Sequence, residues 1–280
     1  MDDRKRGLLY VLLGAIAFSL GGLFVKLIPW APLSISGGRC IFSSMVIGLY
    51  IHFSGHRIKM NAMVLLGAAF VSAMLVCYVT SMKLTSAANA IVLEYTAPIF
   101  IILFEAILFR KKPRKLDLIV CIVVFAGIII VVFDGSEHGS FLGDMVALTS
   151  GVFYALTIML NDFKGSDSLS SVFFGHVFTI FIGLSSILAE SDFSLRTLSL
   201  LATLGVFQAG AGYTLLTAGL KLCEPLAGSL VASIEPVLNP ILVALFYGET
   251  MNVRAIIGAI IVIGTIAVYN VVSLKQDRKS

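Results

Sequence analysis

Long uninterrupted apolar runs, separated by short links that carry charges or prolines, are the feature that most constrains this sequence. Crossing the hydrocarbon core of a bilayer as a helix takes about 20 consecutive apolar residues, which is the length of these runs. Because 58% of the residues are hydrophobic and only 13% are charged, too few polar side chains remain to cover a globule in water. The runs also lack the inside/outside alternation of a transmembrane β-barrel. The sequence therefore predicts an all-α integral membrane protein in a lipid bilayer.

The links divide the chain into ten predicted transmembrane helices. Their approximate ranges are 7–28, 34–53, 62–83, 88–109, 116–133, 142–162, 171–189, 198–220, 226–247 and 254–272. Ten crossings use most of the 280 residues and leave no room for a separate soluble domain. The first run could imitate a signal peptide, but it continues to Ile28 and ends at Pro29 without a small-residue cleavage site.

Basic residues predict the orientation of the helices, because cytoplasmic loops carry an excess of Lys and Arg. With the N-terminus placed in the cytoplasm, fifteen of the 20 Lys and Arg residues fall on the inner side, while Arg39 lies within a span. The four on the outer side are Lys26, Lys83, Arg196 and Arg254. This bias predicts both termini in the cytoplasm and an even number of crossings of the inner cell membrane. It also accounts for the net charge of +4, so no nucleic-acid partner is expected.

The second half of the chain repeats the pattern of the first half. Pairs that superpose at shifts of 136 to 138 residues are Gly7 with Gly143, Gly38-Arg39 with Gly175-His176, Gly67 with Gly205, Lys83-Leu84 with Lys221-Leu222 and Pro98 with Pro236. We therefore predict two five-helix repeats, residues 1–135 and 136–280. Because five is odd, the second repeat must enter the membrane in the opposite direction, and such inverted repeats enclose a solute site near the midplane.

Three glutamates inside the spans are candidate binding groups. An ionised carboxylate at the centre of a helix costs about 2.5 to 3.5 kcal/mol on insertion scales, so each needs a partner, a water-filled cavity or a proton. Glu94 and Glu235 lie three residues apart when the repeats are superposed, on neighbouring turns of equivalent helices. They could bind an ion or solute, or could be structural partners of other polar groups. For Glu105, nearer the cytoplasmic end, the structural role is favoured.

Arg39 and His176 occupy matching positions early in their helices. Arg39 could recognise an anion, or could extend to the membrane interface, as long basic side chains do near helix ends. His176 could take part in proton coupling, or could simply form a hydrogen bond at the interface.

Pro98, Pro236 and Pro240 each remove a backbone donor within a span and so predict broken helices, which commonly build the solute sites of transporters. A kink in a packed helix is the alternative reading. Asn239, four residues after Glu235, shares its helix face and could complete a polar pocket. Further polar and aromatic candidates at depth are Tyr78, Gln208 and Tyr213. Such a cavity would suit an amino acid or a flat heterocycle.

Enzymatic chemistry has no motif here. The sequence contains no GxxxxGK[ST] phosphate loop, no HExxH and no GxSxG. The four cysteines show no metal-ligand spacing and are interpreted as small buried apolar residues. We expect neither an enzyme nor a cofactor or metal.

Four segments resemble the EamA-type branch of the drug/metabolite transporter superfamily, and the resemblance extends over nearly the whole chain. They are GAIAFSLGGLFVKL, GDMVALTSGVFYAL, SAANAIVLEYTAPIFIILFEAILFRKKP and EPLAGSLVASIEPVLNPILVALFYGETMNVRAIIGAIIVIGTIAVY. Arg39, Pro98, Pro236 and the Gly248-Glu249 pair match the family's pattern, whereas Phe18 and Tyr154 stand where tryptophan is frequent or expected. The resemblance implies ten helices in two repeats and secondary transport, often export of amino acids, related metabolites or toxic analogues from bacterial cytoplasm.

We therefore expect a permease that exports a small metabolite, such as an amino acid, by alternating access with protons as a possible coupling ion. An importer or bidirectional facilitator of a nucleobase, amine or vitamin-like solute is the alternative within transport. A membrane sensor or binding subunit without turnover is the alternative from another class. A homodimer is compatible with the sequence.

Overall fold

A computed structural model gives the fold of the chain, and it describes all residues except 1–2, 109, 111, 134–139, 161–162, 221, 224–227, 229–230, 233, 250–251 and 278–280. The predicted repeat boundary at 135–136 lies outside the described residues, as do four of the basic residues used to predict orientation: Lys111, Lys221, Arg278 and Lys279.

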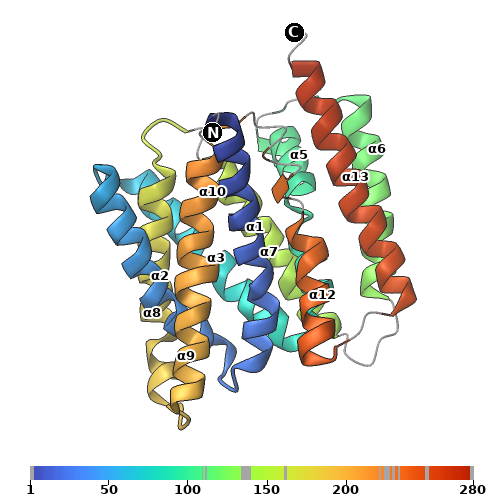
Figure 1. The fold of residues 1–280 in the computed structure, drawn as a ribbon. Helices are drawn as coiled ribbons and strands as arrows, with labels where there is room; N and C mark the ends of the chain where they lie inside the picture. The colour runs from blue at the N-terminus through green and yellow to red at the C-terminus, as the bar shows by residue number, and fades with distance from the viewer. Residues whose placement is uncertain are drawn as a thin grey trace.

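The described chain is helical, as the sequence predicts (Figure 1). The helices are α1 (Asp3–Leu27), α2 (Pro32–Ser54), α3 (Ala62–Leu84), α4 (Ala87–Glu94), α5 (Ala97–Leu108), α6 (Lys115–Val132), α7 (Phe141–Leu160), α8 (Ser168–Leu188), α9 (Leu195–Thr203), the π-helix η1 (Leu204–Ala211), α10 (Gly212–Leu220), α12 (Glu235–Tyr247) and α13 (Val253–Asp277). Among described residues, eight helical segments are long and apolar enough to cross a membrane, and two shorter apolar helices, Glu235–Tyr247 and Val253–Tyr269, follow them. Ten crossings remain a prediction.

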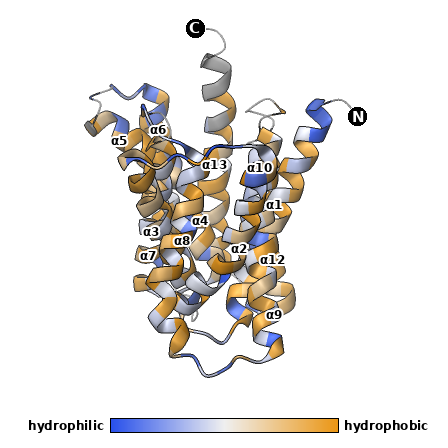
Figure 2. Ribbon diagram, turned by 90° about the vertical axis from the view of Figure 1, so that its left-hand side faces the viewer, coloured by the Kyte–Doolittle hydropathy of each residue, from blue (hydrophilic) through white to orange (hydrophobic). Residues whose placement is uncertain are grey.

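Hydrophobic residues predominate along the helices, and hydrophilic residues are more frequent at the helix ends and in the links (Figure 2). Large hydrophobic side chains are exposed on the outside of the helices, among them Ile122, Phe181 and Leu245 at 69 to 72% exposure. Lipid tails solvate such a surface, whereas the helical backbone satisfies its own hydrogen bonds. The chain is accordingly a multi-pass membrane protein.

Side-chain caps begin several of these helices. Asn61 accepts a hydrogen bond from the amide of Val64 at the start of α3, and Ser86 accepts one from Asn89 at the start of α4. Pro32 begins α2 at a position where its missing N–H costs nothing. The helix ends at Gly55, whose φ of 67° is left-handed and favours glycine.

Asp167 caps α8 and ties it to the link after α2. Its carboxylate accepts hydrogen bonds from the amide of Ser170 and from His56 Nε2, each at 2.9 Å. Burial by itself would raise the pKa of the Asp167 carboxyl, but these hydrogen bonds hold that pKa below its usual value.

Two of the spans depart from a regular α-helix. The chain leaves the helix at Tyr95 and Thr96, between α4 and α5, so that Pro98 falls in the first turn of α5, where its missing donor is tolerated. The span from Leu195 to Leu220 is unbroken but widens into η1 at its centre, and such π-helical segments are frequent at functional sites.

Contacts at the helix ends show the relative directions of α1 and α7. At the end of α1, Lys26 Nζ donates to the carbonyl of Thr85 at 2.9 Å, and the Thr85 hydroxyl donates to Asp144, in the first turn of α7, at 2.7 Å. Helix α7 therefore begins where α1 finishes, and the two helices run in opposite directions. Helix α1 begins at the same end of the bundle at which α13 finishes (Figure 1). We call this end the N-terminal end and the opposite one the far end.

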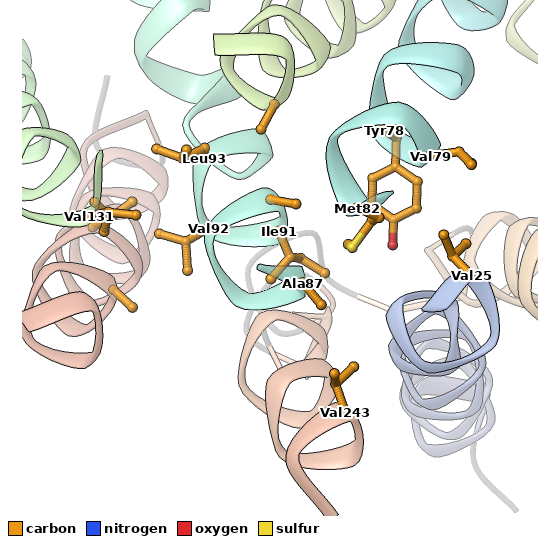
Figure 3. Close-up of a cluster of buried hydrophobic side chains, with 14 of the residues drawn as sticks. Val25, Tyr78, Val79, Met82, Ala87, Ile91, Val92, Leu93, Val131 and Val243 are labelled. Carbon is orange, nitrogen blue, oxygen red and sulfur yellow. The ribbon is translucent and has the colours of Figure 1, made fainter. Parts of the chain in front are cut away.

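The short helix α4 lies in the middle of the main hydrophobic core. Ile91 and Leu93 are fully buried, and this cluster also includes Val25 of α1, Val131 of α6 and Val243 of α12 (Figure 3). Apolar packing on all sides fixes the end of α4, and with it the position of Glu94.

Small residues allow α1 and α10 to approach closely. A Cβ added to Gly219 would lie 2.7 Å from the carbonyl oxygen of Gly7 and 2.8 Å from the amide nitrogen of Val11. Backbone contact of this kind is typical of helix pairs in membranes.

We expect Gly219→Ala to lower the midpoint of thermal unfolding of the purified protein in detergent. Overpacking against backbone atoms that cannot move aside costs about 1 to 3 kcal/mol. Gly264→Ala on α13 is the matched control, because nothing lies within 4 Å of its added Cβ. That control should leave the midpoint unchanged or raise it slightly, since Ala is the better helix former. Equal midpoints for the two variants would contradict the close packing of α1 and α10.

Candidate functional site

A cavity of about 310 Å³ lies in the middle of the bundle, between α1, α2, α3, the α4–α5 break, α7, η1, α10, α12 and α13. Its walls include six of the residues proposed from sequence as binding groups: Arg39, Tyr78, Glu94, Gln208, Tyr213 and Glu235. Pro98 lines it as well, whereas Asn239, His176, Pro236 and Pro240 are not among its lining residues. The volume is at the lower end of the range for small-molecule sites.

The cavity reaches towards the N-terminal end of the bundle. Its lining includes Ile158, two residues before the end of α7, and Leu216, four residues before the end of α10. Ile158 is 39% exposed. Gln208, by contrast, lies near the middle of the Leu195–Leu220 span.

Glu94 is the last residue of α4 and projects into the cavity from the edge of the helix break. The hydroxyl of Ser150, on α7, donates a hydrogen bond to Glu94 Oε1 at 2.7 Å. The close approach of the two helices depends on Gly151, where an added Cβ would lie 3.1 Å from the carbonyl oxygen of Glu94. The packing of α4 against α7 thus supplies the partner of this carboxylate.

Glu235 is the first residue of α12 and has an equivalent arrangement. The phenol of Tyr95, in the break between α4 and α5, donates to Glu235 Oε2 at 2.7 Å. Both carboxylates are therefore held by neutral hydroxyl groups across helix–helix contacts. For the described residues, neither carboxylate has a basic side chain within 4.0 Å.

Arg39 lies in the second turn of α2 and is only 1% exposed. Its Nη1 donates to Gln208 Oε1 at 3.1 Å, and its guanidinium carbon lies 5.6 Å from the centre of the Tyr78 ring. Extension to the membrane interface, one of the two readings made from sequence, is therefore wrong for this arginine. Its position in the second turn suggested the interface, but the neighbouring helices cover it completely.

His176 is buried behind the cavity wall rather than at the interface. Its Nδ1 lies 2.8 Å from the carbonyl of Val172, and its ring meets that of Tyr213 edge to face, with the centroids 5.8 Å apart. Tyr213 also meets Phe18 edge to face at 5.1 Å. His176 thus supports an aromatic wall of the cavity through Tyr213.

Asn239 and the two prolines of α12 fall beside the cavity. Asn239 is fully buried against α1, where an added Cβ on Gly22 would overlap its amide. Pro236 lies in the first turn of α12, and Pro240 lies inside the helix. In α12, therefore, only Pro240 removes a donor from the interior of a helix.

Two polar lining residues, Tyr95 and Tyr154, were not proposed as binding residues from sequence, nor was Ser150, which bonds to Glu94 but does not itself line the cavity. Tyr95 directly follows Glu94 and could have been noticed as an aromatic residue at the same depth. The pairing of Ser150 with Glu94 carries no local signal, because it depends on how α7 packs against α4.

At the far end of the bundle, an ion pair forms between Lys26, on α1, and Glu249, which follows α12. Lys26 Nζ lies 2.7 Å from Glu249 Oε2, and the two side chains are only 11% and 8% exposed. Glu249 Oε1 also accepts a hydrogen bond from the amide of Ala87 at 2.6 Å. This Lys26–Glu249 pair joins α1, α4 and α12, the three elements that carry Phe18, Glu94 and Glu235 around the cavity.

An all-helical bundle with a lipid-facing surface and a polar cavity at its centre defines a multi-pass membrane protein with a solute-sized site. Residues 5–133 and 141–271 each match the model of the EamA-like transporter family. The chain belongs to this family.

Three curated proteins are similar to the chain. "Solute carrier family 35 member G1" of Homo sapiens is 29% identical over 172 residues, which are 55% of this chain and 47% of that protein. Its Mus musculus counterpart is 31% identical over 140 residues, 48% of this chain and 38% of that protein. An "Uncharacterized transporter" of Clostridium kluyveri is 26% identical over 214 residues, 70% of this chain and 67% of that protein. The chain thus spans about half the length, or less, of the two mammalian relatives. All three relatives are named as solute carriers or transporters, not as enzymes.

A solved structure described as "Crystal structure of protein" has the same fold. It superposes with a TM-score of 0.66, covering 98% of this chain and 99% of that one, at 18% sequence identity. Identity this low extends the similarity to the fold alone.

We expect Glu249→Gln to lower the thermal unfolding midpoint clearly, because it leaves the Lys26 ammonium buried without its counter-charge. Removing one partner of a buried pair typically costs about 3 to 5 kcal/mol. Lys59→Met is the control, because Lys59 is 56% exposed and lies 3.6 Å from Asp167, a pair of the kind that contributes about 1 kcal/mol or less. An unfolding midpoint for Glu249→Gln as high as that of the control would show that the far end is not held by this pair.

Proposed function

We propose that this chain is a secondary transporter that moves a small metabolite, such as an amino acid, by alternating access between two oppositely inserted five-helix halves. The observation that carries the proposal is the asymmetry of the cavity. Its lining extends towards the N-terminal end, whereas at the far end the Lys26–Glu249 pair ties α1 to the residues after α12, which we interpret as closure of that end. A central site that communicates with one side only is what one state of such a transporter requires.

The two halves have independent support. The family model matches twice, over residues 5–133 and 141–271, and α1 and α7, which open these two regions, run in opposite directions. With the basic residues placed in the cytoplasm, the N-terminal end faces the cytoplasm. The cavity then receives solute from inside the cell, and loss of the Lys26–Glu249 pair would open it to the outside. Export from the bacterial cytoplasm is the direction that we propose.

Proton coupling is favoured by the partners of the two carboxylates. A hydroxyl group can donate a hydrogen bond to a carboxylate and can accept one from a carboxylic acid. Ser150 and Tyr95 can therefore serve Glu94 and Glu235 in either protonation state, whereas an arginine partner would hold them ionised. An ionised carboxylate in an apolar membrane interior is costly. Binding of a proton would remove that free-energy cost during the transport cycle.

The proposal is tested in two stages. A thermal-shift screen of the purified protein against amino acids, nucleobases, quaternary amines and vitamins identifies solutes that stabilise it, because a bound ligand raises the unfolding midpoint. Flux of each stabilising solute is then measured in proteoliposomes of known protein orientation, in both directions. Faster uptake from the outer face would favour the importer, and binding without any flux would favour a sensor.

We expect Glu94→Gln and Glu235→Gln to reduce solute-driven proton movement, read with a pH-sensitive dye inside the liposomes, by at least about tenfold. The reason is that the side-chain amide of glutamine neither takes up nor releases a proton at the pH values of such an assay. Glu105→Gln is the matched control, since it makes the same change in the same span but lies outside the cavity lining. Transport that ignores both the pH gradient and these substitutions would remove the carboxylates from the mechanism.

A further inference from the structure

The guanidinium of Arg39 is a buried cation with unused donors. Among its nitrogens, only Nη1 has an acceptor in the described part of the chain, and Nε and Nη2 are buried without one. Burying a charged donor without a partner costs more than burying a neutral one. A native structure that keeps such a group usually uses it for a ligand or another functional contact.

The other basic side chains at the edges of the bundle do not share this deficit. Lys26 has Glu249 at 2.7 Å, Lys83 donates to the carbonyl of Ile28 at 2.6 Å, and Arg114 has Asp117 at 3.3 Å. The two carboxylates that line the same cavity as Arg39 are instead bonded to Ser150 and Tyr95. Among these basic side chains, Arg39 is thus the one that lines the cavity and keeps buried donors without an acceptor among the described residues.

The neighbours of Arg39 fix its orientation. Its backbone carbonyl lies against Gly205 so closely that an added Cβ there would overlap it, which brings α2 onto η1. Gln208, in η1, then reaches Nη1, and the Tyr78 ring lies 5.6 Å from the guanidinium carbon. Because Nη1 already has an acceptor, the remaining donors are Nε and Nη2. These two nitrogens lie on one edge of the planar guanidinium, and their parallel N–H groups match the two oxygens of a carboxylate.

We infer that the Arg39 fork, Nε and Nη2, binds the carboxylate group of the transported solute and that the site therefore selects carboxylate-bearing solutes over neutral heterocycles and simple organic cations. This inference deepens the proposed transport function and rests on it. In the arrangement seen here both nitrogens are buried, so the entering carboxylate has to displace surrounding side chains as it binds.

The rest of the cavity favours a carboxylate over a phosphate. Glu94 and Glu235 line the same space of about 310 Å³. When ionised they would repel a doubly charged phosphate far more strongly than a singly charged carboxylate. They also offer a complementary place for an amine on the same solute, which fits a zwitterion in which the carboxylate faces Arg39 and the amine faces the glutamates.

The first experiment compares acids with their uncharged analogues on wild-type protein. Free amino acids and simple monocarboxylates are compared with the matching carboxamides and methyl esters, together with inorganic phosphate, nucleobases and quaternary amines. We expect at least one carboxylate to raise the unfolding midpoint and to be transported, with its carboxamide weaker by roughly tenfold or more. If only neutral solutes, cations or phosphate bind and are transported, the inference fails while the proposed transport function stands. If wild-type protein moves none of the solutes, both fail.

The second experiment uses Arg39→Lys, which keeps the charge but loses the fork, and Arg39→Gln, which loses both. We expect the preference for acid over amide to fall in Arg39→Lys and to vanish in Arg39→Gln, whereas Arg196→Gln, on α9 outside the cavity lining, keeps it. Each variant is first checked for a monodisperse elution profile. If Arg39→Gln does not fold, the wild-type comparison and Arg39→Lys decide. A folded Arg39 variant that still discriminates acid from amide as the wild type does would overturn the inference.

Discussion

Charged groups inside this bundle have to be compensated without help from bulk water, and the way in which this is done organises the molecule. Lys26 and Glu249 compensate each other at the far end, and backbone groups of Thr85 and Ala87 complete the pair. In the middle of the bundle, Glu94 and Glu235 receive single hydrogen bonds from neutral hydroxyls. The charges at the far end are thus neutralised by an ion pair, whereas the two central carboxylates have only neutral partners. The carboxylates that can most readily change partners or protonation state therefore lie beside the cavity.

The apolar runs and their punctuation were enough to predict the class of fold. The need for backbone hydrogen bonds in lipid allows few alternatives to helices, so hydropathy locates spans such as α3 (Ala62–Leu84) within a residue or two. The exact break in the fourth span was harder. Pro98 indicated an interruption, but the helix ends earlier, at Tyr95, and the proline then begins the next helix. The π-helix at Leu204–Ala211 has no proline to announce it.

Six of the eight binding residues proposed from sequence line the cavity, because polar groups within apolar helices turn away from lipid. Their partners were beyond reach of the sequence. The contact of Ser150 with Glu94 spans 56 residues, and that of Tyr95 with Glu235 spans 140. Such pairs depend on helix packing, which small residues such as Gly151 permit but do not specify on their own. For the same reason the depth of Arg39 was open, since its place near a helix start allowed either the interface or the interior.

Helices α1 and α12 connect the central site to the far end. Helix α1 carries Gly22, which packs against Asn239 of α12, and ends near Lys26, whose partner Glu249 follows α12. A movement of α12 relative to α1 therefore changes both the walls of the cavity and the distance between the two charges. Glu235 begins the same helix and accepts a hydrogen bond from Tyr95 at the break after α4, so this carboxylate is carried by the element that Glu249 follows. Helices α1 and α12 thus contact each other both beside the cavity and at the far end. Coupling between solute binding and opening of the far end requires elements that are shared by both regions in this way.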